Sequence, residues 1–411
     1  MLIIRDPLWN NIRVDALGLQ LVDTPVFQRL RYVRQLGLAY LVYPGATHTR
    51  FEHALGTYHL ARLTLNQLDE RGELAGISRE QRATAQAAAL LHDVGHYPFS
   101  HALEEIGALH HEQVAAPLID RGPVADALCR TLGPSAPRDV LDLISGVSPS
   151  PLQGLISGSL DLDKIEYLKR DALMCGVPYG EIDVDRLLNS LVLVDEPATG
   201  RRVIGVLEKG LSALESLLFA KYQMYRNVYW HHAVRSATAM YKRLVDEALV
   251  RGDLDATSLS SYDDEGLLHR LGERETPPLL SALRERRLYK RVLECPAAEL
   301  SGEQLEWIAD DRALTIATED AIGASLGFGP GELLLDFPAK TQMLGLDLPV
   351  VRRSGDVRRL TAAGLEGAIN LPVLSEQLYQ SARWLRVFAV RRVDVPRAEL
   401  LEQLVRVGQR A

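Results

Sequence analysis

Cysteine is scarce in this chain of 411 residues, which contains only Cys129, Cys175 and Cys295. They are odd in number and far apart, so the sequence indicates neither a disulfide framework nor a CxxC zinc site. Long apolar runs are also lacking, because no stretch approaches the roughly 20 residues that span a bilayer. The first residues, MLIIRDPLWNN, do not resemble a secretory signal. We therefore predict a cytoplasmic protein without a membrane segment.

Positive charge and aromatic residues are in short supply as well. The formal net charge is −8, and aromatic residues make up 6% of the chain. Dedicated nucleic-acid-binding proteins usually carry a basic excess, and single-strand binding needs aromatic side chains on which bases can stack. The composition therefore argues against nucleic acid as a partner. It does not exclude a small phosphate ligand, whose binding depends on local charge.

The sequence pattern predicts a mainly α-helical protein. Residues 1–20 carry the turn signals of a short strand or hairpin, and residues 24–248 are predicted to be mostly helical. Ser78 and Gln81 have the spacing of a capping box, which predicts a helix over residues 78–94. Residues 211–249 show a long helical pattern without proline.

A change of composition at residues 251–264, RGDLDATSLSSYDD, indicates a linker or an irregular connection. Beyond it, ELLLDFP, DLPVVRR and WLRVFAVRRVDV are short apolar runs bounded by proline, glycine and charge, as strands tend to be. We therefore predict a helical catalytic core over residues 1–250 and a smaller C-terminal α+β lobe over residues 251–411.

Histidine is concentrated in one part of the chain. Of eleven histidines, most lie between residues 48 and 111: His48, His53, His59, His92, His96, His101, His110 and His111. A single histidine is more often a satisfied core or surface residue than a ligand. The crowding, however, is hard to explain by packing alone and indicates metal or acid–base chemistry.

The segment LLHDVGHYPFSH places His92 beside Asp93 near the end of a predicted helix. Imidazole nitrogen and carboxylate oxygen together suit a divalent transition metal such as Mn, Fe, Zn, Co or Ni. Because two ligands are too few for a stable site, other residues must converge on it. The best candidates are His53 in TRFEHALG and Asp163 in SLDLDKIEYLKRD. We therefore predict a site of two histidines and two carboxylates, with positions open to water and substrate.

These motifs carry a family resemblance. TRFEHALG, LLHDVGHYPFSH, HHEQ and DLDKIEYLKRD match, in order and spacing, the HD-domain deoxynucleoside triphosphate (dNTP) triphosphohydrolases. The match begins at DTPVFQRLRYVRQLG and extends past YQMYRNVYWHH, with the HD motif region at about residues 50–172. The resemblance implies a helical HD core that hydrolyses dNTPs to deoxynucleoside and inorganic triphosphate. A Mg²⁺ ion would accompany the triphosphate.

The resemblance also assigns roles around the substrate. Arg50 and Lys164 would hold phosphate oxygens, Tyr167 would pack on the sugar and Asp171 would bond the 3′-hydroxyl. Asp163, Tyr167 and Asp171 are spaced i, i+4 and i+8, so they form one stripe on a helix. The structural alternatives are core packing for Tyr167 and a salt bridge for Asp171.

Four further positions match the family's substrate side. Gln35 and Leu36, in RQLG, correspond to residues that line the deoxyribose and crowd C2′, which discriminates against ribonucleotides. Lys221 lies where the family usually has a phosphate-binding arginine, and lysine keeps the charge but loses the bidentate fork. Tyr229 also matches a substrate-side position.

Acid–base work falls to the remaining histidines. His96, His101 and His111 match family residues near the α-phosphate, and one of them would protonate the leaving group. Glu104 lies three residues after His101 and could orient it. The sequence does not say which histidine is the general acid.

A nucleotide activator is a further expectation from the resemblance. The positions that match effector contacts are Asp23, Gln28, Arg31, Arg286 and Lys290. Such a site lies between subunits, so we expect a symmetric homo-oligomer, a dimer or a tetramer. The alternative for the basic run at residues 284–291 is a solvated surface.

The regulatory part departs from the family pattern near the N-terminus. The family's usual DPxHG is DPLWN at residues 6–10, Arg5 replaces a usual asparagine and Leu2 replaces a usual basic residue. The departures concern the effector and leave the catalytic motifs intact.

Two other functions are compatible with parts of the sequence. One is an HD phosphohydrolase acting on a nucleoside monophosphate or signalling nucleotide, against which Gln35, Tyr167 and Asp171 argue. The other is a nucleotide-sensing or single-strand nucleic-acid-binding module, against which the complete ligand set argues. The preferred base, the native metal, the oligomeric state and the need for an activator are not given by the sequence.

Overall fold

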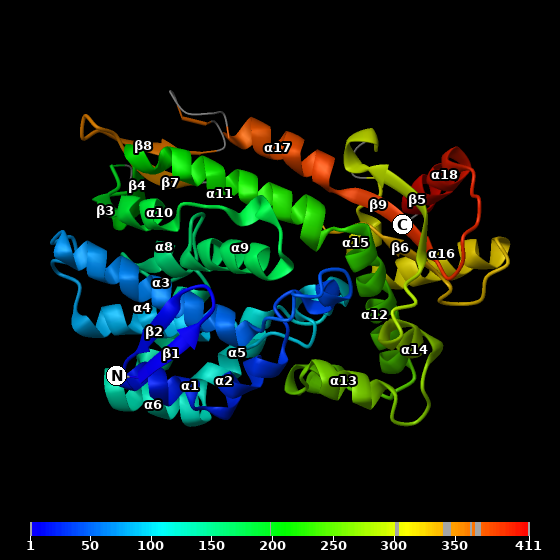
Figure 1. Cartoon of the computed structure of the whole chain (residues 1–411), viewed down its shortest axis with the longest axis horizontal. Coiled ribbons are helices and arrows are strands. Elements are labelled where there is room, and N and C mark those ends of the chain that lie inside the picture. The colour runs from blue at the N-terminus through cyan, green and yellow to red at the C-terminus, as the bar shows by residue number, and fades with distance from the viewer. Residues whose placement is uncertain are drawn as a thin grey trace.

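The chain begins with a β-hairpin, as its turn signals predicted. The structure is a computed structural model that describes residues 2–197, 199–300, 304–339, 347–361, 364–365 and 371–409. Strand β1 (Leu2–Asp6) pairs antiparallel with β2 (Asn10–Val14), with Ile4 opposite Ile12. Ile12 and Val14 are fully buried, so β2 turns alternate side chains into the core and the hairpin lies against α3 (Figure 1).

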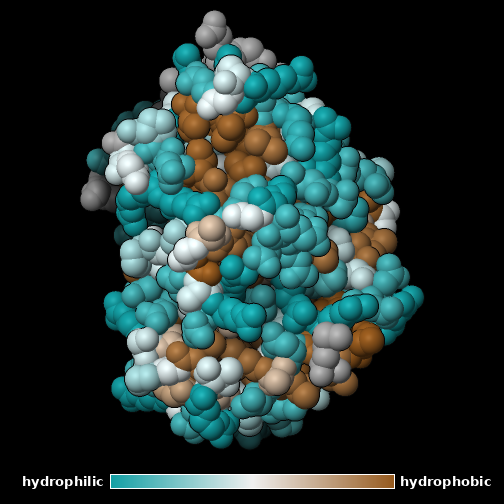
Figure 2. Space-filling view, turned by 90° about the vertical axis from the view of Figure 1, so that its left-hand side faces the viewer, coloured by the Kyte–Doolittle hydropathy of each residue, from teal (hydrophilic) through white to brown (hydrophobic). Residues whose placement is uncertain are grey.

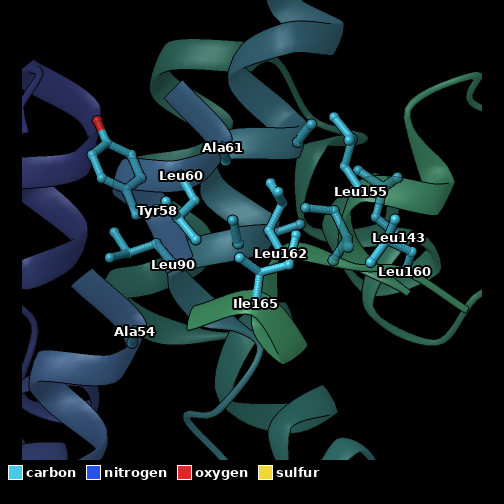
Figure 3. Close-up of a cluster of buried hydrophobic side chains, with 14 of the residues drawn as sticks. Ala54, Tyr58, Leu60, Ala61, Leu90, Leu143, Leu155, Leu160, Leu162 and Ile165 are labelled. Carbon is cyan, nitrogen blue, oxygen red and sulfur yellow. The ribbon is translucent and has the colours of Figure 1, made fainter. Parts of the chain in front are cut away.

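Nine helices follow and form the core that holds the histidine motifs. They are α1 (Ala16–Val22), α2 (Pro25–Arg29), α3 (Arg50–Glu70), α4 (Arg79–Leu91), α5 (His111–Asp120), α6 (Gly122–Leu132), α7 (Ala136–Ile144), α8 (Gln153–Ile156) and α9 (Leu162–Cys175). Figure 3 shows Leu60 of α3, Leu90 of α4 and Ile165 of α9 in one buried cluster. Burial of this apolar surface fixes the three helices that carry the predicted metal ligands relative to one another.

The capping prediction for α4 is confirmed. The backbone N–H of Gln81 donates to Oγ of Ser78, and the N–H of Ser78 donates to the Gln81 side chain. These reciprocal bonds satisfy two N–H groups that the first turn leaves unpaired. Leu91 is the last helical residue, so His92 is the C-cap.

Residues 24–248 are mostly helical, as predicted, but the regular α-helical pattern is interrupted in two places. After α10 (Val184–Ser190), strands β3 (Leu191–Asp195) and β4 (Arg202–Leu207) form an antiparallel pair. The pattern predicted as one long helix is α11 (Leu211–Met224) and α12 (His232–Val250), separated by a π-helical turn, Tyr225–Tyr229. The N–H of Trp230 reaches the carbonyl of Tyr225, five residues back, over 2.8 Å. Such π-turns are frequent at functional sites.

The C-terminal part is α+β, as predicted. Its described helices are α13 (Asp264–Leu271), α14 (Pro278–Arg284), α15 (Trp307–Asp310), α16 (Arg312–Ser325), α17 (Leu371–Ala382) and α18 (Arg397–Gly408). Its described strands are β5 (Lys290–Pro296), β6 (Leu333–Asp336), β7 (Leu348–Val351), β8 (Val357–Leu360) and β9 (Trp384–Ala389). The three predicted strand runs are β6, β7 and β9.

Two sheets organise these strands. One has the order β5-β9-β6, and the other has the order β3-β4-β7-β8. In the second sheet, β7 pairs parallel with β4, with Val350 opposite Val206. A strand from beyond residue 250 thus completes a sheet begun before it, and α17 runs beside α11 (Figure 1). The division at residue 250 stays a prediction.

The surface seen in Figure 2 is mainly hydrophilic, with hydrophobic side chains gathered in separate areas. Throughout the described parts of the chain, every helix is too short or too polar to cross a membrane.

Candidate metal and substrate site

The four predicted metal ligands lie together. His53 comes from the first turns of α3, His92 and Asp93 from the end of α4, and Asp163 from the first turn of α9. Nε2 of His53 lies 3.2 Å from Nε2 of His92 and 2.9 Å from a carboxylate oxygen of Asp163. Oxygens of Asp93 lie 3.5 Å and 3.4 Å from the same two nitrogens. This donor set suits a divalent transition metal.

The other nitrogen of each ligand histidine is also held. Nδ1 of His53 lies 2.6 Å from Glu166, which is fully buried, and Nδ1 of His92 lies 2.9 Å from the carbonyl of Ala89. These partners fix both imidazole rings with Nε2 turned to the ligand cluster. Gly56 makes room for Glu166, because a Cβ at that position would lie 2.0 Å from the carboxylate.

The electrostatics of the cluster favour positive charge. Burial would lower the pKa of His53, but hydrogen bonds to Asp163 and Glu166 raise it to about 10. Burial would raise the pKa of Asp163, but His53 and His92 hold it well below its usual value. The carboxylates thus stay ionised and are suited to a cation between them.

A pocket of about 750 Å³ opens from this cluster. That volume lies within the range of ligand pockets. Apart from Lys221, the residues predicted to bind substrate or act in catalysis line it: Gln35, Leu36, Arg50, His96, His101, Glu104, His111, Lys164, Tyr167, Asp171 and Tyr229. Three of the predicted metal ligands, His92, Asp93 and Asp163, also line it, whereas His53 is fully buried.

Cationic side chains lie on the metal side of the pocket. Arg50 donates to Asp93 over 2.7 Å and to Oγ of Ser100 over 3.1 Å. Nζ of Lys164 donates to Asp161 and to the carbonyl of Gly158. In this state Lys164 is held by an acidic neighbour and would have to turn to reach a phosphate.

Lys221 lies behind the pocket wall. Its Nζ is 5.9 Å from the ring centre of Tyr225, which lines the pocket. Burial, and then the positive charge of Lys164, lower the pKa of Lys221 to about 8. Its ammonium group is therefore sensitive to pH near neutrality.

A second hydrogen-bonded group, around Asp171, also lines the pocket. Asp171 accepts from the hydroxyl of Tyr229 over 2.8 Å, and its other oxygen lies 2.8 Å from Nε2 of His48. Tyr167 precedes Asp171 by one turn of α9. Oε1 of Gln35 is buried without a hydrogen-bond partner among the described residues, so it can still bond a ligand.

Glu104 joins two of the three candidate acid–base histidines. It lies 3.1 Å from Nδ1 of His101 and 2.8 Å from Nδ1 of His111. Burial opposes ionisation, but these histidines hold the pKa of Glu104 well below its usual value. His96 differs, because burial followed by Arg50 and His111 keeps its pKa well below the usual value. A neutral His96 is a poor proton donor, so His101 and His111 are the better candidates.

Backbone geometry sets the spacing of these histidines. A Cβ on Gly95 would lie 2.1 Å from the carbonyl of His111, so glycine lets α5 approach the HD turn. Phe99 and Ser100 both adopt left-handed backbone, with φ of 57° and 62°. Oγ of Ser100 donates to the carbonyls of Arg34 and Gln35, which holds this strained turn in place.

Three residues around the site were not predicted: Glu166, Ser100 and His48. Glu166 lies three residues after Asp163, so its place on α9 was a usable signal. His48 belongs to the histidine-rich segment but was given no role. Ser100 lies within LLHDVGHYPFSH, and its role depends on a backbone conformation that the motif does not reveal.

The predicted effector residues form two groups, and all of them are exposed except the half-buried Gln28. Arg31 donates to Gln28 over 2.8 Å near the end of α1, where Asp23 is the C-cap. Arg286, at φ of 55°, donates to the carbonyl of Leu41, and Lys290 begins β5. Within the described chain no hydrogen bond or ion pair joins the two groups, and the effector site stays a prediction.

Comparisons with known proteins agree with this geometry. The HD domain family matches residues 50–153, and the HD associated region matches residues 182–365. An uncharacterized protein of Methanocaldococcus jannaschii is 37% identical, over 75% of this chain and 63% of its own length. The deoxynucleoside triphosphate triphosphohydrolase SAMHD1 homolog of Dictyostelium discoideum is 27% identical, over 77% of this chain and 64% of its own.

A solved structure shows the same fold along the chain. A hypothetical protein from Aquifex aeolicus is 26% identical and has a TM-score of 0.74, with 99% of each chain covered. The chain spans less than two thirds of the length of the two curated relatives above. With its HD motif, its matching associated region and this shared fold, the chain belongs to the HD-domain family and is similar to the deoxynucleoside triphosphate triphosphohydrolases.

Proposed function

We propose that this protein hydrolyses dNTPs to a deoxynucleoside and inorganic triphosphate. The observation that carries the proposal is a pocket whose lining includes two chemically different groups of residues. The first group, called the first side below, is the cation-binding set built on His92 and Asp163, and the second group, called the second side, is Asp171 with Tyr229 and Gln35. A simple phosphomonoesterase has no need of the second side.

The first side would bind the phosphates of the substrate. A divalent cation held by His53, His92, Asp93 and Asp163 would supply Lewis-acid chemistry, and Mg²⁺ would accompany the triphosphate. Arg50, Lys164 and Lys221 neutralise charge that develops on the phosphate oxygens.

Proton transfer to the leaving group is assigned to His101 and His111, the two histidines that Glu104 contacts. Water attacks the α-phosphorus and releases one proton to solvent, the bond from phosphorus to O5′ breaks, and O5′ takes a proton from His101 or His111, which is reprotonated from solvent. Glu104 orients both rings through Nδ1 and stabilises their protonated forms.

The second side would select the sugar. Asp171 accepts a hydrogen bond from the 3′-hydroxyl, since each carboxylate oxygen can accept more than one. Tyr167 packs on the sugar, and Gln35 and Leu36 occupy the space near C2′. A 2′-hydroxyl would crowd these residues, so ribonucleotides bind less well.

The test is incubation with each dNTP and NTP, with Mn²⁺ or Mg²⁺, followed by ion-exchange separation. The proposal expects triphosphate from dNTPs and much slower turnover of NTPs. Equal turnover of both classes, or activity confined to monophosphates, would instead support the broader HD phosphohydrolase function.

Regulation is a second part of the proposal. A nucleotide bound by Asp23, Gln28 and Arg31 of one subunit and Arg286 and Lys290 of another would stabilise a dimer or tetramer by mass action. It activates only if it binds the active assembly more tightly than the inactive one. Activity assays with a second dNTP, read together with light scattering, test this. A fully active monomer that ignores the second nucleotide excludes it.

A further inference from the structure

The tip of the N-terminal hairpin reaches the carboxylate that holds His53. Nε1 of Trp9 donates to Oε1 of Glu166 over 2.9 Å, although the two residues are 157 positions apart. The other oxygen of Glu166 lies 2.6 Å from Nδ1 of His53. The Trp9 ring also contacts His59 of α3, at 5.9 Å between ring centres. The hairpin therefore contacts the carboxylate that holds Nδ1 of His53, the nitrogen turned away from the other predicted metal ligands.

A buried ion pair ties the same carboxylate to the hairpin a second time. Arg170, which is 1% exposed, donates from Nε to Oε1 of Glu166 over 2.7 Å and from Nη1 to Asp6 over 3.0 Å. The other oxygen of Asp6 accepts the backbone N–H groups of Leu8 and Trp9 over 2.8 and 2.7 Å. Asp6 thus both anchors Arg170 and forms the turn that aims the Trp9 indole.

We infer that the β1–β2 hairpin helps to build the proposed metal site, with Trp9 and Asp6 as positioning residues that orient His53 through Glu166. Trp9 and Arg170 occupy Oε1 of Glu166, which leaves Oε2 for His53. With both oxygens engaged, Glu166 cannot rotate away, and the His53 ring keeps Nε2 directed toward His92 and Asp163, where a cation would bind. Neither hairpin residue belongs to the four-ligand set. The inference requires a cation at the four-ligand site but does not require that the substrate be a dNTP.

The experiment is titration of the metal-free full chain with Co²⁺, read by its visible absorption spectrum and by calorimetry. Trp9→Phe keeps the aromatic ring and removes only the indole donor. We expect it to weaken Co²⁺ binding about tenfold and to alter the spectrum, as loss of outer-shell partners does. Trp307→Phe is the matched control, because Nε1 of Trp307 has no hydrogen-bond partner in the described part of the chain.

A double-mutant cycle separates positioning from general stability. If Trp9 acts through Glu166, then Trp9→Phe adds nothing to the weaker Co²⁺ binding of Glu166→Gln. Should Trp9→Phe fail to fold by circular dichroism, Asp6→Asn replaces it, since it keeps the turn acceptor and removes the charge opposite Arg170. Co²⁺ affinity and spectrum unchanged in the folded variant, or fully additive losses in the cycle, would overturn the inference.

Discussion

The hydroxyl of Tyr229 donates a hydrogen bond to Oδ2 of Asp171 over 2.8 Å, across 58 positions of sequence. Tyr229 ends the π-helical turn between α11 and α12, and Asp171 lies on α9. The irregular turn thus supplies a partner that fixes the carboxylate on the proposed sugar side of the pocket.

The sugar side predicts a kinetic effect for Asp171→Ala. Loss of a well-placed hydrogen bond to substrate should lower kcat/KM for dNTPs. The decrease should correspond to about 1–3 kcal/mol of lost transition-state binding energy. Gln35→Ala should act in the same direction. Steady-state kinetics with one dNTP, alongside thermal unfolding, measure both effects. Unchanged kcat/KM in a folded Asp171→Ala variant would refute the assignment.

The contacts of Glu104 with His101 and His111 predict that substitution of Glu104 lowers turnover. Glu104→Gln keeps the shape but loses the charge that orients and stabilises His101 and His111, so kcat should fall by about 10²–10⁴-fold. Glu112→Gln is the matched control, because Glu112 follows His111 and bonds no histidine among the described residues. The assay is kcat at saturating dNTP. Equal kcat in the two variants would argue against acid–base work by this pair.

Lys221 predicts a pH dependence of substrate binding. Burial lowers its pKa to about 8, so the ammonium form is present below that pH and is lost as pH rises through it. Loss of the positive charge on Lys221 weakens its attraction to phosphate, so KM for dNTPs should rise between pH 7 and 9. Lys221→Arg stays charged and should flatten the profile. A KM that rises equally in both proteins would assign the titration to another group.

Metal binding should stabilise the protein through His92. A ligand that binds only the folded state at a free concentration 100 times its Kd adds about 2.7 kcal/mol to the free energy of unfolding. Mn²⁺ should therefore raise the Tm of the metal-free chain, and a chelator should reverse the rise. His92→Ala should lose most of the shift. An equal shift in both proteins would place the bound metal elsewhere.

The convergence of the four predicted metal ligands was foreseeable, because the residues lie in recognisable sequence motifs. His92 comes at the end of a capped helix, and Asp163 comes in the first turn of the next motif helix. Glu166 was within reach of the same reasoning. The role of Trp9 was not predictable, because its contact with Glu166 depends on where the hairpin packs against α3.

The errors in the fold prediction have a similar origin. The helical pattern of residues 211–249 contains no proline, so nothing in the periodicity marked the π-turn before Trp230. The strand signal in residues 348–351 was clear, but its partner, β4, could not be deduced because parallel pairing joins distant segments.

Hydrolysis of one dNTP in H₂¹⁸O tests the central claim most directly, with mass spectrometry of both products. The proposed reaction breaks the bond between the α-phosphorus and O5′ by attack of water at phosphorus. It therefore predicts unlabelled deoxynucleoside and one ¹⁸O in the inorganic triphosphate. Release of a deoxynucleoside monophosphate with pyrophosphate, or ¹⁸O in the 5′-hydroxyl, would contradict the account.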